Sequence, residues 1–331
     1  MARTVRFHEL GGPEKLRIED VPEREPGKGE VRINVEAFAL NRADLMYLTG
    51  THAMTAQFPS RIAFEAVGTV EKVGPGVTGF KPGDRVANVP YGTPGYEVAG
   101  ETAVLPDFAL VHVNDRLGLT LEESTSVWMQ YMTAWGALMS FGKLQAGDKV
   151  LVTAGSSSAG IGAIQLAKDA GATVIATTRG PAKKGFIKSV GADHVVVTDE
   201  EDLARSVMDF TSGEGVRLTY DCVAGPFLEK CVDASSFGGE VMIYGMLGEL
   251  PTEVPIVKMV LKEVILRPYS MITVFNDPVR RKAGLNYVSG RLAAAGFQPV
   301  IDRVFELADI VDAYRYMIES DHKGKIVVRV K

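Results

Sequence analysis

The sequence predicts an α/β protein with a β-rich domain first and a doubly wound parallel-sheet domain after it. The chain has 331 residues, which at about 100–200 residues per domain suggests two domains. Residues 1–122 contain short β segments separated by glycine and proline, and from about residue 123 strands alternate with helix-length segments. Such alternation is typical of βαβ units in a parallel sheet.

Strands and turns dominate the first part of the chain. Residues 31–35 alternate apolar and polar side chains, the period-2 pattern of a half-buried strand. Residues 67–73 form another apolar run, which ends at the glycine-proline turn 74–76, and residues 80–86 give a further turn and strand. We therefore expect an irregular, mostly antiparallel β domain.

The second part predicts a parallel sheet enclosed by helices. Its expected strands are residues 149–153, 173–177, 194–197, 216–221, 240–244 and 264–267. Helices are expected over 161–170 and 277–295, and a final strand over 326–330. We expect residues 1–123 to form the first domain, 124–270 the second, and 271–331 a return segment that completes the first.

Composition excludes several classes of protein. Cys222 and Cys231 are the only thiols, which excludes a disulfide scaffold and a four-cysteine zinc site and fits a reducing cytosol. The net charge is −5 without a long run of one sign, so we expect no nucleic-acid partner. No apolar run approaches the roughly 18–20 residues of a membrane helix, and the first residues lack an apolar signal core. We expect a cytoplasmic protein that does not bind membranes.

A glycine-containing loop gives the sharpest local signal. Residues 153–162 read Thr-Ala-Gly-Ser-Ser-Ser-Ala-Gly-Ile-Gly, after a predicted strand and before a predicted helix. Small residues there let the backbone approach a pyrophosphate, which the positive end of the helix attracts. An ordinary strand–helix turn is the alternative, because the strict G-x-G-x-x-G spacing is absent. The expected cofactor contacts in this loop are Ser156, Ser157, Ser158, Ala159, Gly160 and Ile161.

The end of the second strand indicates which dinucleotide binds. An NAD site usually has an acid there for the ribose 2′-hydroxyl, but this chain has none between residues 177 and 183. Instead Arg179 and Lys183 suit a 2′-phosphate, beside Thr178. Two solvated surface cations are the alternative, and we favour NADPH.

Motifs along nearly the whole chain carry a resemblance. The chain resembles the zinc-independent quinone oxidoreductase group of the medium-chain dehydrogenase/reductase superfamily. The motifs are Gly11-Gly12-Pro13, Asn41-Arg-Ala-Asp44, Gly68-Thr-Val, Val73-Gly-Pro-Gly76, Phe80-Lys-Pro-Gly-Asp-Arg-Val86, Thr133-Ala134, the 153–162 loop, Gln165-Leu-Ala-Lys168, Gly191-Ala-Asp193, Phe305-Glu-Leu and Gly324-Lys-Ile-Val327. Each is weak alone, and their order and spacing together are specific.

The resemblance implies a GroES-like β domain followed by a Rossmann domain, with the active site in the cleft between them. It also implies NADPH as hydride donor, a quinone or α,β-unsaturated carbonyl as acceptor, and a homodimer.

Zinc is not expected. Zinc-dependent relatives bring a cysteine and a His-Glu pair to a catalytic metal, but here Asn41 stands at the cysteine position and Phe64-Glu65 at the His-Glu position. The first domain has no cysteine for a structural zinc lobe. The histidines are scattered, with no two at metal-ligand spacing: His8, His52, His112, His194 and His322.

One group of expected catalytic residues lies on residues 41–52. The amide of Asn41 can donate a hydrogen bond to a substrate carbonyl, although an asparagine capping a turn is the alternative. Tyr47 and His52 follow on the same segment, where a solvated loop histidine is the alternative for His52. Relatives often carry Arg and Tyr where this chain has Leu48 and His52, so it departs from them within the expected acceptor pocket.

A second group lies around residues 128–134, which in relatives border the nicotinamide. Gln130 and Thr133 are expected to contact the cofactor and Tyr131 to be catalytic, although aromatic residues at helical spacing are usually core. Four further residues, at strand ends and in the tail, are expected to contact the cofactor: Val223, Tyr244, Gly245 and Lys325. For Lys325 the alternative is a surface lysine.

These observations favour hydride transfer from NADPH to a quinone or to the β-carbon of an α,β-unsaturated carbonyl. Two alternatives stay open. One is a non-catalytic NADPH-binding protein that senses nucleotides or binds RNA. The other is a carbonyl reductase or a zinc alcohol dehydrogenase.

Overall fold

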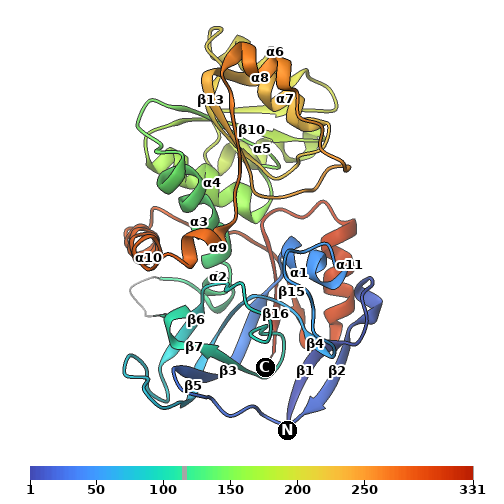
Figure 1. The fold of residues 1–331 in the computed structure, drawn as a ribbon, viewed down its shortest axis with the longest axis vertical. Helices are drawn as coiled ribbons and strands as arrows, with labels where there is room; N and C mark the ends of the chain where they lie inside the picture. Colours follow the sequence, from blue (N-terminus) through green and yellow to red (C-terminus); the bar gives the residue numbers. More distant parts are fainter. Residues whose placement is uncertain (114–117, 331) are drawn as a thin grey trace. The chain divides into compact units, whose positions relative to one another are not determined.

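The computed structural model describes residues 1–113 and 118–330, which form two compact units (Figure 1). Unit 1 consists of Met1–Met129 and Pro299–Lys331, and unit 2 of Gln130–Gln298. Both divisions fall later in the chain than the expected boundaries at 123 and 270. The later division follows from packing, because α9 (Met271–Phe275) and α10 (Pro278–Ala293) contact η4 (Trp135–Phe141) inside unit 2.

Unit 1 is built on β-sheets. Its larger sheet has seven strands in the order β15-β16-β3-β5-β6-β8, with β7 also paired to β3. The strands are β3 (Glu30–Ala39), β5 (Glu65–Val73), β6 (Arg85–Asn88), β7 (Thr102–Pro106), β8 (Leu110–His112), β15 (Ile301–Glu306) and β16 (Lys325–Arg329). Among the described strands of this sheet, every pairing is antiparallel except that of β15 with β16, so the expectation of a mostly antiparallel domain is confirmed.

A smaller sheet and short helices complete unit 1. The sheet has the order β2-β1-β4, formed by β1 (Ala2–Phe7), β2 (Arg17–Val21) and β4 (Ser60–Arg61). The helical segments are η1 (Pro13–Lys15), α1 (Arg42–Leu48), η2 (Asp107–Ala109), α2 (Leu121–Ser124), η6 (Leu307–Asp309) and α11 (Ile310–Glu319), and α3 (Trp128–Ala134) begins here.

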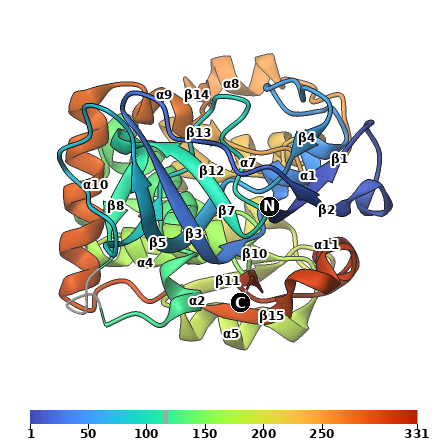
Figure 2. The same ribbon diagram turned by 90° about the horizontal axis from the view of Figure 1, so that it is seen from below.

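Alternation along the strands builds the core of unit 1. Val31, Ile33 and Val35 of β3 are buried together, as the period-2 pattern predicts. Figure 2 shows β3 and β5 lying side by side, in agreement with their antiparallel register. The carboxyl-terminal tail joins this sheet through β16, where Val327 faces Ala39.

Unit 2 contains a six-stranded parallel sheet in the order β11-β10-β9-β12-β13-β14. The strands are β9 (Lys149–Val152), β10 (Thr173–Thr178), β11 (His194–Val197), β12 (Val216–Asp221), β13 (Ser235–Ile243) and β14 (Ile265–Pro268). Each coincides with or overlaps a predicted strand. The parallel sheet and the α/β class are therefore confirmed.

Helices connect these strands, namely α4 (Ser158–Asp169), η5 (Pro181–Lys183), α5 (Lys184–Ser189), α6 (Leu203–Phe210), α7 (Phe227–Ala234) and α8 (Ile256–Lys262). α9 and α10 follow the last strand, β14. The predicted helices at 161–170 and 277–295 correspond to α4 and α10. The direction of the strand order reverses between β9 and β12, and doubly wound sheets bind ligands at the carboxyl ends of strands at such a point.

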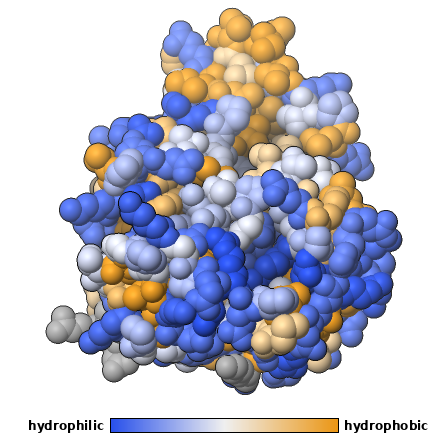
Figure 3. All heavy atoms as spheres, turned by 60° about the horizontal axis from the view of Figure 1, so that its bottom comes forward, coloured by the Kyte–Doolittle hydropathy of each residue, from blue (hydrophilic) through white to orange (hydrophobic). Residues whose placement is uncertain are grey.

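Apolar side chains are exposed at one edge of the unit 2 sheet. They belong to α8 and to β14, which is the last strand of the sheet. Figure 3 shows hydrophobic side chains gathered at the upper end of the view. Among the described helices, none is both long and apolar enough to cross a membrane.

Candidate functional site

The turn between β9 and α4 is held by its own polar groups. Ser157 is the N-cap of α4, and its Oγ accepts a hydrogen bond from the Gly160 N–H at 3.0 Å. The Gly155 N–H donates to the Thr177 carbonyl at 2.9 Å, which ties the loop to the end of β10. The loop is therefore anchored at both ends before any ligand binds.

Small residues are required in this loop by close backbone contacts. A Cβ at Gly160 would lie 2.5 Å from the Ala154 carbonyl oxygen, and one at Gly155 would lie 3.0 Å from the Ala176 Cβ. Ser156, Ser157, Ser158 and Ala159 are partly exposed, whereas Gly160 and Ile161 are buried. A tight small-residue turn at the amino end of a 12-residue helix fits the pyrophosphate of a dinucleotide.

The end of β10 carries the expected cations. The Thr178 side chain is buried, and its hydroxyl donates to the Gly180 carbonyl at 3.2 Å. Arg179 follows and is exposed, with its carbonyl accepting from the Asp199 N–H at 3.2 Å. Lys183 is partly exposed at the end of η5. An exposed guanidinium at this strand end fits a ribose 2′-phosphate.

A buried carboxylate that we had not expected to be functional organises the end of β12. Asp221 Oδ1 accepts from the Thr153 hydroxyl at 2.8 Å and from the Val223 N–H at 3.0 Å, and Oδ2 accepts from the Ala224 N–H at 2.9 Å. Burial raises the pKa of Asp221, while these backbone hydrogen bonds lower it. Asp221 thereby fixes the turn that includes the partly exposed Val223.

Tyr244 and Gly245, the other strand-end residues that we expected to contact the cofactor, are closely packed. The ring of Tyr244 stacks on Tyr220 with centroids 3.9 Å apart. Gly245 lies against Cys222, since a Cβ at Gly245 would be 3.0 Å from the Cys222 Cβ. These contacts place Tyr244 and Gly245 beside the turn that Asp221 holds.

The three expected residues of α3 are buried. Tyr131 is fully enclosed in unit 2, where its hydroxyl donates to Gln165 Oε1 at 2.7 Å and its ring stacks on Phe297 at 4.5 Å. These contacts explain Tyr131 as a core residue, and we omit it from the proposed catalytic set. Gln130 and Thr133 are buried residues of the same helix, and the Gln130 Cβ would lie 3.3 Å from a Cβ at Gly162 of α4.

Unit 1 contains a buried charged cluster around Asn41. Asn41 lies between β3 and α1, and its Oδ1 accepts from the Lys325 ammonium at 2.6 Å. Lys325 Nζ also lies 3.1 Å from Glu65 Oε2, and Glu65 Oε1 accepts from the Met129 N–H at 2.9 Å. The exposed fractions are 7% for Asn41, 1% for Lys325 and 0% for Glu65. The lysine that we expected to contact the cofactor therefore bonds within unit 1.

Asp44 extends the cluster. Its Oδ2 accepts from the Asn41 backbone N–H at 2.7 Å and from the Tyr314 hydroxyl at 3.2 Å. Burial raises the pKa of Asp44 to about 7, although the Asn41 hydrogen bond and the charge of Lys325 lower it. The sequence offered one signal for Asp44, because an acid three residues after an N-cap can bond back to the N-cap N–H. No local pattern pointed to Tyr314.

Tyr47 and His52 lie near one another in unit 1. The Tyr47 hydroxyl bonds with Ser60 Oγ at 2.9 Å and donates to Glu97 Oε1 at 3.1 Å, and burial raises its pKa to about 12. His52 is half-buried, with its Nδ1 accepting from the Met54 N–H at 3.1 Å and its ring 5.8 Å from that of Phe64. Burial lowers the pKa of His52, which favours the neutral imidazole.

The donor groups around Asn41 do not fit a zinc ion. A zinc ion at this place would need Asn41 Oδ1 and Glu65 Oε2 as ligands. Both oxygens instead lie within 3.1 Å of the Lys325 ammonium, whose positive charge would repel a metal ion. Within residues 1–113 and 118–330, no three His, Cys, Asp or Glu residues form a group that could hold a metal. Cys222 and Cys231 are buried, unpaired by disulfide, and belong to unit 2.

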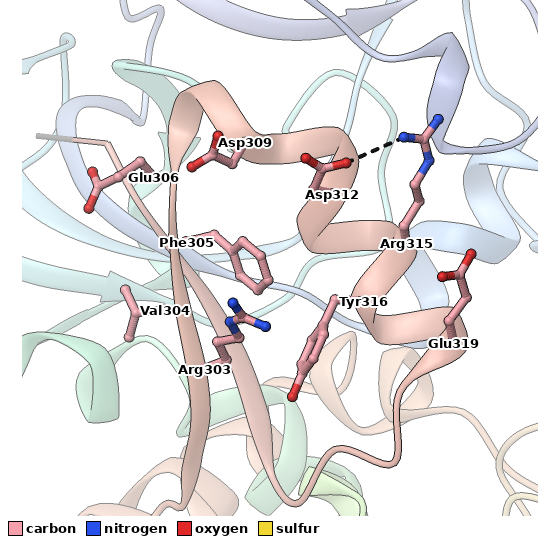
Figure 4. Close-up of a pocket in the computed structure, with 9 residues that line it drawn as sticks. All are labelled: Arg303, Val304, Phe305, Glu306, Asp309, Asp312, Arg315, Tyr316 and Glu319. Atoms are coloured by element: carbon pink, nitrogen blue, oxygen red, sulfur yellow. Dashed lines mark hydrogen bonds and ion pairs between the residues drawn. The ribbon is translucent and has the colours of Figure 1, made fainter.

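A cavity of about 590 Å³ lies elsewhere in unit 1, between β15 and α11 (Figure 4). The Arg303 guanidinium lies 4.9 Å from the ring centroids of both Phe305 and Tyr316. The Arg315 guanidinium donates to Asp312 at the rim. The residues that line this cavity include none of the expected site residues, so it is separate from the groups described above.

Comparison with known proteins agrees with this geometry. Residues 27–135 match the alcohol dehydrogenase GroES-like domain, and residues 159–280 match the zinc-binding dehydrogenase family. A quinone oxidoreductase of Pseudomonas aeruginosa is 33% identical over 245 residues, 74% of each chain. A 2-haloacrylate reductase of a Burkholderia species is 27% identical over 343 residues, 99% of each chain. A solved structure of a mycobacterial protein complexed with NADPH is 27% identical, covers 100% of both chains and has a TM-score of 0.90. The GroES-like and Rossmann assignments are thereby confirmed.

Replacing Asp44 by Asn should change how stability depends on pH. The pKa of this carboxyl rises from its ordinary 3.8 to about 7 on folding, so its contribution to stability is full below pH 4 and is lost as the pH rises toward 7. Between pH 5 and pH 8 the loss is on the order of 2–3 kcal/mol. In urea titrations, the Asp44→Asn variant should therefore gain stability relative to wild type by about that amount from pH 5 to pH 8.

Asp312→Asn provides the matched control, because Asp312 is exposed on α11. Its stability relative to wild type should be the same at both pH values. A constant difference between Asp44→Asn and wild type across this range would show that Asp44 does not titrate there.

Proposed function

The chain belongs to the quinone oxidoreductase group of the medium-chain dehydrogenase/reductase superfamily, and on that premise we propose that it reduces quinones or α,β-unsaturated carbonyls with NADPH. The observation that carries this proposal is the capped small-residue turn before α4, followed on the neighbouring strand by the exposed Arg179. A turn of this kind suits a pyrophosphate, and a guanidinium suits a 2′-phosphate.

The residues of each unit have separate tasks in this proposal. Bound NADPH supplies the hydride, which carries two electrons to the acceptor. In unit 2, the 156–161 loop holds the pyrophosphate, and Arg179 with Lys183 holds the 2′-phosphate. In unit 1, the Asn41 amide donates a hydrogen bond to the acceptor oxygen, where negative charge develops as the hydride arrives at carbon. A proton from water or a side chain then completes the reduction.

We propose that the reaction proceeds without zinc. The Lys325 ammonium supports this, because it occupies the space between Asn41 and Glu65 that a metal would need. A neutral alcohol would lack a Lewis acid to ionise it, whereas an electron-poor quinone or enone accepts hydride without one. The proposal therefore favours reduction of activated double bonds over alcohol oxidation.

We further propose that the protein is cytoplasmic and that it binds a small molecule rather than a nucleic acid. The two cysteines are unpaired and buried, which suits a reducing compartment. A net charge of −5 disfavours binding to a phosphate backbone.

NADPH oxidation assays with 1,4-benzoquinones, naphthoquinones and enones, 2-haloacrylate included, test the proposed function. Turnover with at least one class, in a preparation free of zinc by elemental analysis, is the expected result. NADPH binding without reduction of any acceptor would instead indicate a nucleotide-sensing protein. About one zinc per chain would contradict the metal argument.

Removing the Arg179 guanidinium should weaken the binding of NADPH and leave the binding of NADH nearly unchanged. Arg179→Ala loses a charge-assisted bidentate contact with the 2′-phosphate, so we expect the Kd of NADPH to rise about 10- to 30-fold. The Kd of NADH, which has no 2′-phosphate, should change less than about 2-fold. Nucleotide fluorescence titrations at fixed salt measure both constants.

Arg205→Ala is the control for charge removal, since Arg205 is an exposed arginine of α6 in the same unit. It should leave both dissociation constants unchanged. If the Kd values of NADPH and NADH rose equally in Arg179→Ala, Arg179 would not be the residue that binds the 2′-phosphate.

We also propose that two copies of the chain associate through the edge of the unit 2 sheet. β14 is the last strand in the sheet order, and within residues 1–113 and 118–330 no strand pairs with its outer edge, which can therefore pair with a strand of another copy. The neighbouring α8 exposes apolar side chains, among them Val257 at 73% and Val260 at 70%. An apolar surface beside the outer edge of a strand suits a second copy of the same surface.

Charges introduced on α8 should dissociate this dimer. Sedimentation velocity should find a dimer for wild type and a monomer for the Val257→Glu, Val260→Glu double variant, because association would bury two carboxylates per chain. Val279→Glu is the control, since Val279 is 78% exposed on α10 of the same unit. A wild-type monomer, or a dimer that persists in the double variant, would contradict the proposed interface.

A further inference from the structure

The buried ion pair between Lys325 and Glu65 in unit 1 has no role in the reaction proposed so far. Lys325 and Glu65 are almost completely excluded from solvent, with Nζ and Oε2 3.1 Å apart. Removing two charges from water costs several kcal/mol per ion, and a well-packed apolar pair would often be as stable. Stability therefore does not explain why this position holds a charged pair, and its other contacts point to a different role.

The ammonium of Lys325 determines which way the Asn41 amide faces. An ammonium carries only donors, so the atom of Asn41 that lies 2.6 Å from Nζ must be the oxygen. The amide nitrogen then lies on the opposite branch, where it donates one hydrogen to the Ala39 carbonyl at 3.3 Å. Since Nδ2 has two hydrogens, a second one is left for an acceptor such as a substrate oxygen.

The same ammonium also strengthens that donor. A hydrogen bond from a cation to the amide oxygen draws electron density from the amide, which makes its N–H groups better donors. The effect is stronger in this buried site than it would be in water, because the charge is less screened. The backbone of Asn41 is held independently, because its N–H donates to Asp44 at 2.7 Å. The side-chain orientation of Asn41 is thus set by two bonds, the charged one from Lys325 at 2.6 Å and the longer one to the Ala39 carbonyl at 3.3 Å.

Glu65 provides the matching anchor for Lys325. Its Oε2 attracts the ammonium and its Oε1 accepts from the Met129 N–H at 2.9 Å, near the start of α3. Glu65 is itself at the first position of β5, where it pairs in register with Ala39 of β3. The carboxylate therefore neutralises the lysine and holds it against the rigid sheet.

We propose that Lys325 is a positioning residue that orients and polarises the Asn41 amide toward the acceptor oxygen, with Glu65 as its counter-ion. The inference rests on the proposed function, in which Asn41 binds the acceptor. It assigns Lys325 a task in acceptor reduction and none in direct cofactor binding.

A double-mutant cycle between Lys325→Met and Asn41→Ala tests the coupling. Lys325→Met should lower kcat/KM for the quinone about 10- to 100-fold, because the amide loses its orientation, while the Kd of NADPH changes less than about 2-fold. In the Asn41→Ala background, the same lysine change should cost less than about 3-fold, since no amide is left to position. Independent, multiplicative losses would overturn the proposal, as would a loss of NADPH affinity equal to the loss of turnover.

A nuclear magnetic resonance measurement decides the same question without turnover. The side-chain amide signals of Asn41, assigned by their loss in Asn41→Asp, should shift in Lys325→Met and stay in place in Lys323→Met, a matched change two residues earlier. Unchanged signals in Lys325→Met would overturn the proposal. If wild type reduced no acceptor, the proposed function would fail while this measurement still tested the positioning by Lys325.

Lys325→Gln is a second variant that we expect to fold more readily, because it keeps an N–H donor without the charge. Should Lys325→Met fail to fold, both measurements apply to Lys325→Gln, for which we expect a smaller loss of turnover and a smaller shift. Wild-type turnover and unchanged Asn41 signals in Lys325→Gln would count against the role of the charge.

Discussion

The pairing of the carboxyl-terminal strand β16 with β3 is the interaction on which the arrangement of unit 1 depends. It places Val327 opposite Ala39, and the Leu40 N–H extends it by donating to the Ile326 carbonyl at 3.0 Å. This pairing brings together residues 284 positions apart, so that Lys325 reaches Asn41. Because the whole of unit 2 lies between them in sequence, unit 1 is complete only when the tail has returned. A register slip of one residue would turn Lys325 to the opposite face of the sheet.

Burial decides how the polar groups of this cluster behave. A carboxylate, a carboxyl with a raised pKa and an ammonium lie within one network, and each is almost fully excluded from water. Glu65 and Lys325 neutralise one another, whereas Asp44 has only hydrogen-bond donors and a more distant positive charge. Burial is the largest cause of the raised pKa of Asp44, which reaches about 7. The cluster therefore combines a buried ion pair with one carboxyl whose pKa lies near neutral pH.

Sequence patterns predicted the fold well where the signal is local. Parallel strands buried on both faces are short continuous apolar runs, so β9 and β12 could be located from composition alone. The loop before α4 was recognisable for the same reason, since strand, small residues and helix follow one another directly. Tyr131 shows the limit of such patterns, because an aromatic residue at helical spacing is compatible with a core or with a site. Only its contacts with Gln165 and Phe297 distinguish the two. The bond between Lys325 and Asn41 was also hidden, because no local spacing encodes a contact across the chain.

The two units prepare their polar groups by the same physical means. In unit 2, Ser157 uses its own hydroxyl and carbonyl to satisfy the N–H groups of Gly160 and Ile161, and the preceding N–H groups of Ser158 and Ala159 remain at the positive end of α4. In unit 1, Lys325 and Ala39 each bond to the Asn41 amide and leave it one N–H. In both cases internal hydrogen bonds fix the direction of the remaining donors before a ligand arrives. Fixed donors need little reorganisation when charge develops nearby, and this favours stabilising a transition state over merely binding a substrate.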